Sequence, residues 1–353
     1  MSVGEGTRDN VLDPGPRVTD NRDMKRVGVV VAVCALLVAM SAVVGPAVRA
    51  QPPCAPGVDL RQVAITVDGE RATGRVYEPY RCVPGDSPAT KLVVAVHGHG
   101  GSSADFAPYM AALARTGGSP ILLMDLRSAD GPWRTGDWNL WAGWHDLVAA
   151  TQWYRGEHPD IASTVLWGWS QGGITSGLAV AHGPPGLFDY WVDNYGPSDD
   201  FTMWAAAGSV DPALPRQIER DAGGCVPMIC PLAYIERSPA LLADRLTMRR
   251  AFLIHGTADA IVPFATSVEL RAALTAAGKP FSFYTVVSGR DLTGAIVAGD
   301  HSVGPALFEG GCVVLRLLAG AEPLAPQVSD YVVDVERGVV TAPPAPEGAK
   351  CAA

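Results

Sequence analysis

Charged residues are scarce in this chain of 353 residues, of which 18% are charged and 48% are hydrophobic. This balance allows a sizeable buried core and argues against a disordered chain. The formal net charge is −9, and no stretch of the sequence forms a basic stripe, so we expect no nucleic-acid partner. No internal repeat is visible, and the length suits one large domain or two modest ones.

Cysteine is also sparse, and its spacing lacks the signature of a zinc site. No two cysteines form a CxxC pair, and no histidine lies at zinc-finger spacing from them. Apart from Cys34 near the N-terminus, the cysteines are even in number, which fits an oxidising compartment. A pairing of near neighbours would leave the central sheet unbridged. The disulfides expected on this basis are Cys54–Cys82, Cys225–Cys230 and Cys312–Cys351.

The first 50 residues have the composition of a targeting segment. Met24-Lys25-Arg26 is a short positive region, an apolar run from Val27 to Val44 follows it, and Gly45-Pro46 ends the run. Small residues around Val48-Arg49-Ala50 suit signal peptidase, so we expect cleavage after Ala50 and a mature chain that is secreted or held in the cell envelope. The alternative is an uncleaved membrane anchor, because the apolar run reaches the lower limit for a membrane span.

Short apolar runs alternate with helix-like segments along most of the chain. Strands are predicted at 91–96, 120–124, 163–167, 190–195, 250–254 and 281–287, and helices at 104–115, 138–158, 174–181, 264–277 and 303–318. This alternation predicts an α/β fold with a mostly parallel central sheet and helices on both faces. Asp68-Gly69, between two alternating runs, predicts a hairpin ahead of the sheet.

These segments predict a chain organised in five parts. The leader is 1–50, an N-terminal hairpin region covers 51–90, and the α/β core covers 91–196 and 248–320. Residues 197–247 break the rhythm with glycine, proline and short amphipathic pieces, and we interpret them as a cap insertion over the site. Residues 321–353 are rich in proline and alanine and are expected to form a C-terminal tail, with an ordered hairpin-like piece at 331–341 and Cys351 holding the end.

The most informative motif is Gly168-Trp169-Ser170-Gln171-Gly172, which lies between a predicted strand and a predicted helix. A nucleophile elbow needs this strand–turn–helix setting. Ser170 would then adopt a strained backbone conformation, and the flanking glycines would remove Cβ atoms that clash with the strand and the helix. A serine hydroxyl is a weak nucleophile, so the chain must also supply a base, an acid and oxyanion donors.

Chain order narrows the choice of base. In the elbow arrangement the serine comes first, the acid second and the histidine last. Three histidines follow Ser170: His182, His255 and His301. His182 lies on the helix that leaves the elbow, and His255 precedes the candidate acid. His301 ends a long loop after the last core strand, from which it can reach the strand ends, so we expect it to be the base.

Asp259 is the expected acid, because it follows the predicted strand at 250–254, where an α/β sheet places its ligands. Asp300 is adjacent to His301 in the sequence and is expected to point elsewhere. Asp199 and Asp200 follow the strand at 190–195 and remain alternatives, because an acid there can also reach the imidazole.

Two backbone N–H groups should form the oxyanion hole. Gln171 follows the nucleophile at a helix N-terminus, and His99 lies in the glycine-rich loop after the strand at 91–96. The glycines around His99 let the backbone approach a substrate closely. The pair His97 and His99 has no accompanying carboxylate or third histidine, so we expect no metal, and we interpret His97 as a buried structural residue.

Tryptophan is confined to one part of the chain, because all nine tryptophans lie between residues 133 and 204. Those at 138, 141 and 144 have helical spacing and suit the core. Trp133 lies in a predicted loop and Trp204 in the predicted cap, so these two are the candidate substrate contacts. An aromatic pocket would suit an aryl, acyl or sugar-bearing ester.

Four stretches together resemble the catalytic domain of the α/β-hydrolase superfamily, in its prolyl oligopeptidase-like and esterase branches. They are His97–Gly101, Gly168–Gly173, His255–Asp259 with the following Val262-Pro263, and Asp300-His301, within roughly residues 90–320. The resemblance implies an eight-stranded, mostly parallel sheet and hydrolysis through an acyl-enzyme. Secreted feruloyl and acetylxylan esterases and polyhydroxyalkanoate depolymerases have similar His-Gly loops.

Prolyl oligopeptidases also carry a large N-terminal β-propeller that filters peptides, whereas only about forty residues separate the expected cleavage site from the core here. This departure favours an ester over a peptide as the substrate. We therefore expect a secreted serine hydrolase without metal or cofactor, most simply a carboxylesterase acting on a small-molecule or polymer-bound ester. Membrane contact is expected only if the leader stays attached. The alternatives are a serine peptidase of the prolyl oligopeptidase type and a catalytically silent binding protein with this fold.

Overall fold

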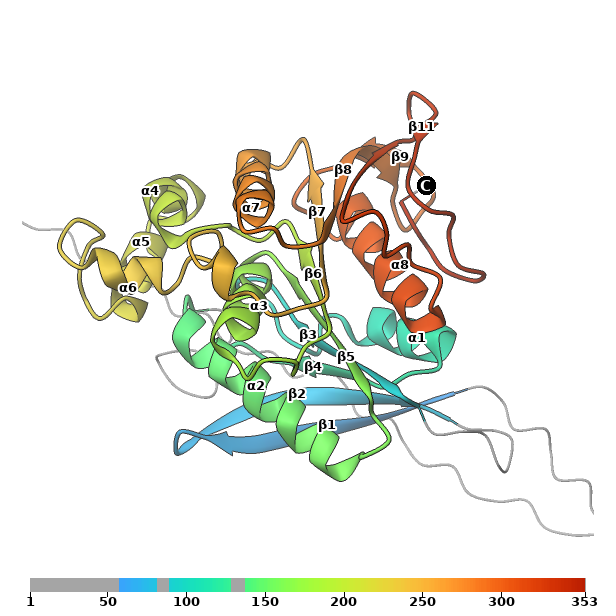
Figure 1. The fold of residues 1–353 in the computed structure, drawn as a ribbon, viewed down its shortest axis with the longest axis horizontal. Helices are drawn as coiled ribbons and strands as arrows, with labels where there is room; N and C mark the ends of the chain where they lie inside the picture. The colour runs from blue at the N-terminus through green and yellow to red at the C-terminus, as the bar shows by residue number, and fades with distance from the viewer. Residues whose placement is uncertain (1–56, 81–88, 128–136, 353) are drawn as a thin grey trace, which may run out of the picture. The chain divides into compact units, whose positions relative to one another are not determined.

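The computed structural model describes residues 57–80, 89–127 and 137–352, and these residues build one large sheet with helices on both sides (Figure 1). The predicted leader, the Cys54–Cys82 pair and Trp133 lie outside the described residues. Within the described part, no helix is long and apolar enough to cross a membrane.

The sheet is open, and its central strands run parallel. Its order is β1-β2-β4-β3-β5-β6-β7-β8-β10-β11, with β9 paired to β8. Strands from β4 to β10 along this path are parallel, whereas β1, β2, β9 and β11 pair antiparallel with their neighbours. The strands are β1 (Val58–Val67), β2 (Glu70–Pro79), β3 (Lys91–Val96), β4 (Ile121–Met124), β5 (Ser163–Trp169), β6 (Tyr190–Asn194), β7 (Arg250–Gly256), β8 (Phe281–Arg290), β9 (Ile296–Ala298), β10 (Val328–Asp334) and β11 (Val339–Val340).

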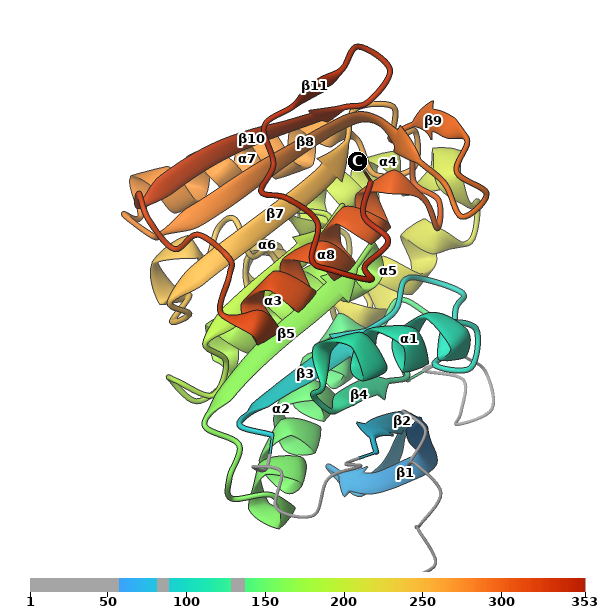
Figure 2. The ribbon, with the colours of Figure 1, turned by 90° about the vertical axis from the view of Figure 1, so that its right-hand side faces the viewer.

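Two layers of helices cover the two faces of the sheet, and further helices lie in the insertion at 197–247. The helices are α1 (Ala107–Gly117), α2 (Leu140–Glu157), α3 (Gln171–His182), α4 (Asp200–Val210), α5 (Leu214–Asp221), α6 (Pro231–Ile235), the short 3-10 helix η1 (Ala243–Arg245), α7 (Phe264–Ala276) and α8 (Pro305–Ala319). One core contains side chains of α2, α3 and α7, and the other contains side chains of α1 and α8, which lie in front of the sheet in Figure 2.

Continuous apolar runs form the central strands because both of their faces are covered. In β3, Leu92, Val94 and Val96 belong to one core, and Val93 and Ala95 belong to the other. Successive side chains on a strand point to opposite faces, so an uninterrupted apolar sequence is needed to fill both cores. The expected α/β class and parallel sheet are confirmed.

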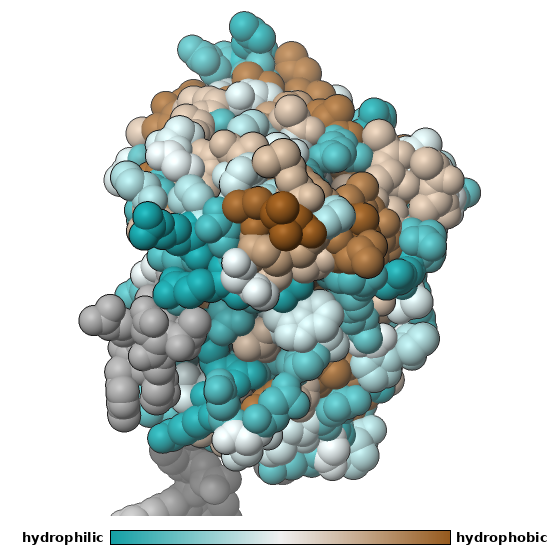
Figure 3. All heavy atoms as spheres, turned by 90° about the vertical axis from the view of Figure 1, so that its left-hand side faces the viewer, coloured by the Kyte–Doolittle hydropathy of each residue, from teal (hydrophilic) through white to brown (hydrophobic). Residues whose placement is uncertain are grey.

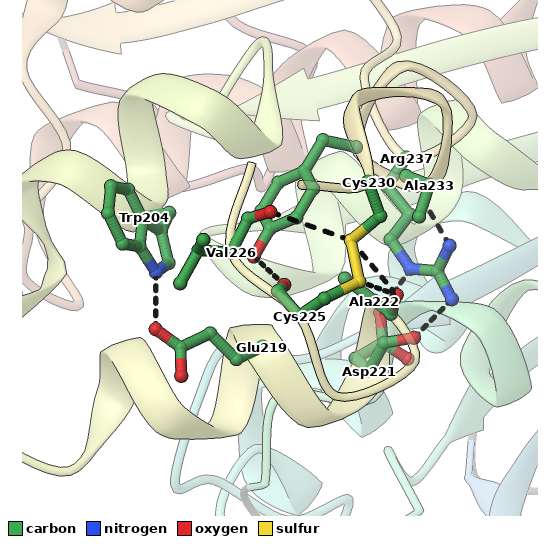
Figure 4. The surroundings of a disulfide bond; sticks show 10 residues. Trp204, Glu219, Asp221, Ala222, Cys225, Val226, Cys230, Ala233 and Arg237 are labelled. Carbon is green, nitrogen blue, oxygen red and sulfur yellow. Dashed lines mark hydrogen bonds and ion pairs between the residues drawn. A yellow bond between two sulfur atoms is a disulfide. The ribbon is translucent and has the colours of Figure 1, made fainter. Parts of the chain in front are cut away.

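The insertion at residues 197–247 contains α4, α5, α6 and η1 and contributes no strand to the sheet. Its apolar side chains form a third core with residues of α2 and α3, including Leu140 and Ile174. A disulfide joins Cys225 to Cys230 between α5 and α6 (Figure 4). Tyr234 donates a hydrogen bond to the Cys225 carbonyl at 2.9 Å. The insertion is therefore anchored on the helices that flank the sheet.

The disulfide loop of the insertion presents aliphatic side chains to solvent. Met228, Ile229 and Leu232 are 84%, 76% and 73% exposed. On the side of the molecule that carries the insertion, apolar side chains gather in one patch (Figure 3). Beside the disulfide, the Arg237 guanidinium lies 2.8 Å from the Asp221 carboxylate (Figure 4).

The C-terminal residues extend the sheet instead of forming a separate tail. β10 pairs parallel with β8 and β11 pairs back onto β10, which together with β9 makes eleven strands among the described residues where the resemblance implied eight. The buried Arg250 donates to the carbonyls of Leu324 and Pro326 at 3.0 and 2.8 Å, which holds the segment before β10. A disulfide between Cys312 and Cys351 fixes the end to α8.

Candidate active site

Ser170 lies at the tip of the turn between β5 and α3 with a left-handed backbone, φ 56° and ψ −126°. Such a conformation is costly for a residue other than glycine and is typical of functional sites. A Cβ on Gly168 would lie 2.0 Å from the Gly172 carbonyl oxygen, and one on Gly172 would lie 2.3 Å from the Val96 carbonyl oxygen. Both flanking positions therefore need glycine, and the turn has the form that the motif predicts.

The structure brings together the three residues expected to act on a substrate. The Ser170 hydroxyl donates to His301 Nε2 at 2.8 Å, and His301 Nδ1 donates to Asp259 Oδ2 at 2.6 Å. The tautomer is assigned from these partners. Ser170 follows β5, Asp259 follows β7, and His301 follows the β8–β9 hairpin, so residues far apart in sequence meet at one edge of the sheet.

The loop that carries His301 is more ordered than the sequence indicates. Residues 289–300 were expected to form a long loop, but β8 continues to Arg290 and pairs antiparallel with β9. The Ala258 N–H donates to the Gly299 carbonyl at 2.9 Å, which ties the Asp259 turn to the His301 turn. Asp300 accepts from the Ser302 N–H at 3.1 Å, so its carboxylate is engaged within its own loop, as expected.

Asp259 is buried and accepts hydrogen bonds on both oxygens. Oδ1 accepts from the backbone N–H groups of Ile261 and Val262 at 2.9 and 2.8 Å, and Oδ2 faces His301 and His255. Burial acts to raise the pKa of Asp259, but hydrogen bonds from His255 and His301 outweigh it and hold this pKa below its ordinary value. Asp259 is therefore a carboxylate across the neutral pH range.

The two alternative acids are engaged away from His301. Asp199 caps α4 and accepts from the Thr202 N–H at 2.7 Å. Asp200 accepts from Trp138 Nε1 at 3.1 Å in the core between the insertion and α2. Among the alternatives that chain order leaves open, the structure places only Asp259 at the imidazole.

The loop after β3 approaches the nucleophile closely. A Cβ on Gly98 would lie 2.9 Å from Ser170 Cβ, so the backbone next to His99 borders the serine. His99 Nδ1 donates to Gln171 Oε1 at 2.9 Å, and Gln171 Nε2 donates to the Asp137 carbonyl at 2.9 Å. These bonds join the two residues expected to supply the oxyanion hole.

His97 is fully buried beside this loop. Its Nδ1 donates to the Gly98 carbonyl at 2.8 Å, and its Nε2 accepts from the Leu126 N–H at 3.2 Å. Both ring nitrogens are therefore occupied by the backbone, which agrees with a structural role. In the described ranges, no group of three or more His, Cys, Asp or Glu side chains is arranged to hold a metal ion.

A pocket of about 160 Å³ opens at Ser170 and His301. Its described lining residues include no Asp, Glu, Lys or Arg side chain. Large apolar side chains of Phe106, Trp169 and Val303, together with Tyr195, supply most of its wall. The remaining lining residues are Gly98, His99, Gly101 and Ser302.

Trp204, one of the two expected substrate contacts, does not line this pocket. Its ring packs in the insertion, and Nε1 donates to Glu219 Oε1 at 3.0 Å (Figure 4). No residue of the insertion at 197–247 lines the pocket around Ser170. Trp204, which was expected to contact the substrate because it lies in the insertion, is therefore outside this pocket. The aromatic wall of the pocket comes instead from core residues such as Trp169, which directly precedes Ser170 in the sequence.

Tyr195 is a feature of the site that sequence patterns did not reveal. It follows β6 with φ 42°, and its ring centroid lies 4.7 Å from that of His301 at an interplanar angle of 57°. Burial raises the pKa of the Tyr195 hydroxyl, with a further contribution from the negative charge of Asp259. A strained tyrosine that stays protonated therefore packs against the imidazole.

Comparison with known families agrees with this geometry. Residues 136–290, which include Ser170 and Asp259, match the model of the prolyl oligopeptidase family. The chain has the α/β-hydrolase fold, and over residues 136–290 it is similar to the prolyl oligopeptidase family. Its Ser170–His301–Asp259 arrangement is that of a serine hydrolase. A search of curated proteins finds no match for this hydrolase.

Solved peptidase structures share the fold of this hydrolase. The acylaminoacyl peptidase of Pyrococcus horikoshii has a TM-score of 0.57 at 16% identity, over 80% of this chain and 44% of that one. A puromycin-hydrolyzing peptidase of Mycobacterium tuberculosis has a TM-score of 0.53 at 20% identity, over 77% of this chain and 42% of that one. Dipeptidyl peptidase 4 of Porphyromonas gingivalis has a TM-score of 0.54 at 17% identity, over 75% of this chain and 36% of that one. The hydrolase thus spans less than half of each of these chains.

Proposed function

We propose that this hydrolase cleaves carboxylic esters through an acyl-enzyme, with Ser170 as nucleophile, His301 as general base and then general acid, and Asp259 as the residue that orients the imidazole. The observation that carries the proposal is the unbroken hydrogen-bond chain from Ser170 through His301 to the buried carboxylate of Asp259. A positioned base is what turns a serine hydroxyl into a nucleophile.

The reaction follows from this geometry in two steps. Ser170 Oγ attacks the ester carbonyl while His301 Nε2 takes its proton, and the same nitrogen then protonates the leaving alcohol. Water, activated by His301, releases the acid from the acyl-serine. The backbone N–H groups of Gln171 and His99 are proposed to hold the developing oxyanion, supported by the close approach of the Gly98 backbone to Ser170.

The pocket supports an uncharged acyl group. Its wall combines Phe106, Trp169, Tyr195 and Val303, and none of its described lining residues is a carboxylate that could pair with the free amino terminus of a peptide. Its volume of about 160 Å³ lies below the usual range for drug-sized ligands, which favours a short acyl chain or a small aromatic acid.

A serine peptidase is the second candidate, because the family model that matches residues 136–290 is that of the prolyl oligopeptidases. Nitrophenyl esters and nitroanilides with the same acyl groups distinguish the two. We expect turnover of short-chain and aromatic esters, no turnover of aminoacyl anilides, and loss of ester turnover in Ser170→Ala. Anilide cleavage at rates comparable to ester cleavage would contradict the esterase proposal and support the peptidase.

The site of action is proposed to be outside the cytosol. The disulfides Cys225–Cys230 and Cys312–Cys351 support an oxidising compartment. Fractionation of cells that express the full chain, followed by N-terminal sequencing, tests this proposal together with cleavage after Ala50.

A further inference from the structure

A second histidine contacts the acid of the site. His255 lies at the end of β7 and is fully buried. Its Nε2 lies 3.3 Å from Asp259 Oδ2, the same oxygen that accepts from His301 Nδ1 at 2.6 Å. One carboxylate oxygen therefore faces two imidazoles.

The partners of His255 fix the position of its hydrogen. Nε2 lies 2.9 Å from the Val262 carbonyl, which can only accept, so Nε2 carries the hydrogen. Nδ1 lies 2.6 Å from Ser267 Oγ on α7 and accepts from that hydroxyl. The Nε2–H is shared between the Val262 carbonyl and Asp259 Oδ2, so His255 is a donor to the carboxylate.

We propose that His255 is a positioning residue of the hydrolase, which holds Asp259 in place through its Nε2–H and withdraws negative charge from the oxygen that His301 faces. The proposal rests on the function proposed above for Ser170. His255 does not line the pocket around the nucleophile, so it acts through Asp259 and touches no substrate. Ser267 strengthens the effect, because donation to Nδ1 makes Nε2–H a better donor.

Removing this donor should change the pH dependence of catalysis. Asp259 Oδ2 would face His301 with more negative charge, which favours the protonated imidazole and so extends the inactive range toward higher pH. Within the described ranges, the other titratable groups beside these imidazoles are Tyr195, whose ring centroid lies 4.7 Å from that of His301 and 6.3 Å from that of His255, and Asp300 in the loop before His301. Both are kept in every variant below, so a shift is attributable to His255.

The test compares His255→Phe, which keeps a ring but no donor, with His255→Gln, which keeps an N–H near the Nε2 position. We expect His255→Phe to lower kcat about tenfold at unchanged KM, and to move the acid limb of the kcat/KM profile up by about half a pH unit. His255→Gln should restore kcat to within about threefold and return the acid limb to its original position. His182→Gln, at the far end of α3, is the control and should leave the limb in place.

Equal losses in His255→Phe and His255→Gln, with the acid limb unmoved, would show that His255 only fills space and would overturn the proposal. If His255→Phe does not fold, Ser267→Ala tests the same chain, with a smaller fall in kcat and a limb shift in the same direction expected. A Ser267→Ala profile identical to wild type would also overturn it.

A measurement without substrate separates this proposal from the proposed function. We expect the His301 Nδ1 proton, in its 2.6 Å hydrogen bond, to give a low-field proton NMR signal that moves further downfield in His255→Phe. An unmoved signal contradicts the role of His255 whatever the activity. Absence of Ser170-dependent turnover in the wild type, with the signal shifted, would refute only the proposed function.

Discussion

Asp193 is a buried carboxyl on β6 whose replacement should stabilise the hydrolase in a pH-dependent way. The residue is 1% exposed, Oδ1 accepts only a 3.2 Å bond from the Gly196 N–H among the interactions of the described residues, and Oδ2 finds no hydrogen-bond partner there. A Cβ on Gly173 would lie 2.2 Å from Oδ1, so α3 packs directly on this carboxyl. Burial raises its pKa from 3.8 to about 7.

The sign of the effect follows from proton linkage. As pH rises, the unfolded chain releases the Asp193 proton near pH 4, whereas the folded chain retains it until about pH 7. Between these values the folded state binds more protons, so this carboxyl makes stability fall as pH rises. A difference of about three pKa units corresponds to about 4 kcal/mol above pH 7, of which roughly 2 to 3 kcal/mol is lost between pH 5 and pH 8.

Asp193→Asn keeps the shape and removes the titration. The measured quantity is the free energy of unfolding in urea of Asp193→Asn minus that of wild type. We expect this difference to be larger at pH 8 than at pH 5 by roughly 2 kcal/mol. Asp160→Asn, at an exposed position, is the control and should show no such growth. A difference between Asp193→Asn and wild type that is the same at both pH values would refute the reasoning.

Three further substitutions test other parts of the structure. Asp259→Asn should lower kcat by about 10⁴-fold with the fold intact, because the amide cannot hold His301 in the required tautomer; kinetics with a nitrophenyl ester check this, and a loss below about tenfold would contradict it. Gly98→Ala should lower kcat/KM by about 10²-fold, because its Cβ would lie 2.9 Å from Ser170 Cβ and displace the nucleophile or the oxyanion loop. Arg250→Met should lower the free energy of unfolding by about 3 kcal/mol in urea titrations, because the carbonyls before β10 lose their buried donor; an unchanged midpoint would contradict this role.

Local patterns were sufficient to predict the central strands and the elbow. β3, β5 and β7 contain the continuous apolar runs 92–96, 165–167 and 251–254, and such runs are typical of strands covered on both faces. The turn at Ser170 is specified within five residues by glycines whose replacement would clash. Chain order then led to His301 and Asp259, which the structure places in hydrogen-bond contact with the site.

Features that depend on distant partners were not visible in the sequence. β10 pairs with β8 although the whole of α8 lies between them in the sequence. Arg250 holds the segment before β10, but a strand pattern does not distinguish this arginine from a surface residue. The role of His255 depends on contacts with the following turn and with α7. Trp204 was assigned to the pocket from its place in the chain, but sequence position does not tell which way a helical side chain points.

The central claim is that Ser170 is the nucleophile of this hydrolase, and covalent labelling tests it most directly. The purified protein and its Ser170→Ala variant are treated with a fluorophosphonate, and the labelled peptide is identified by mass spectrometry. The structure predicts one label on Ser170 in the wild type and none in the variant, because only this serine has a hydroxyl 2.8 Å from His301 Nε2 among the described residues. Equal labelling of both proteins, or a label on another serine, would contradict the account.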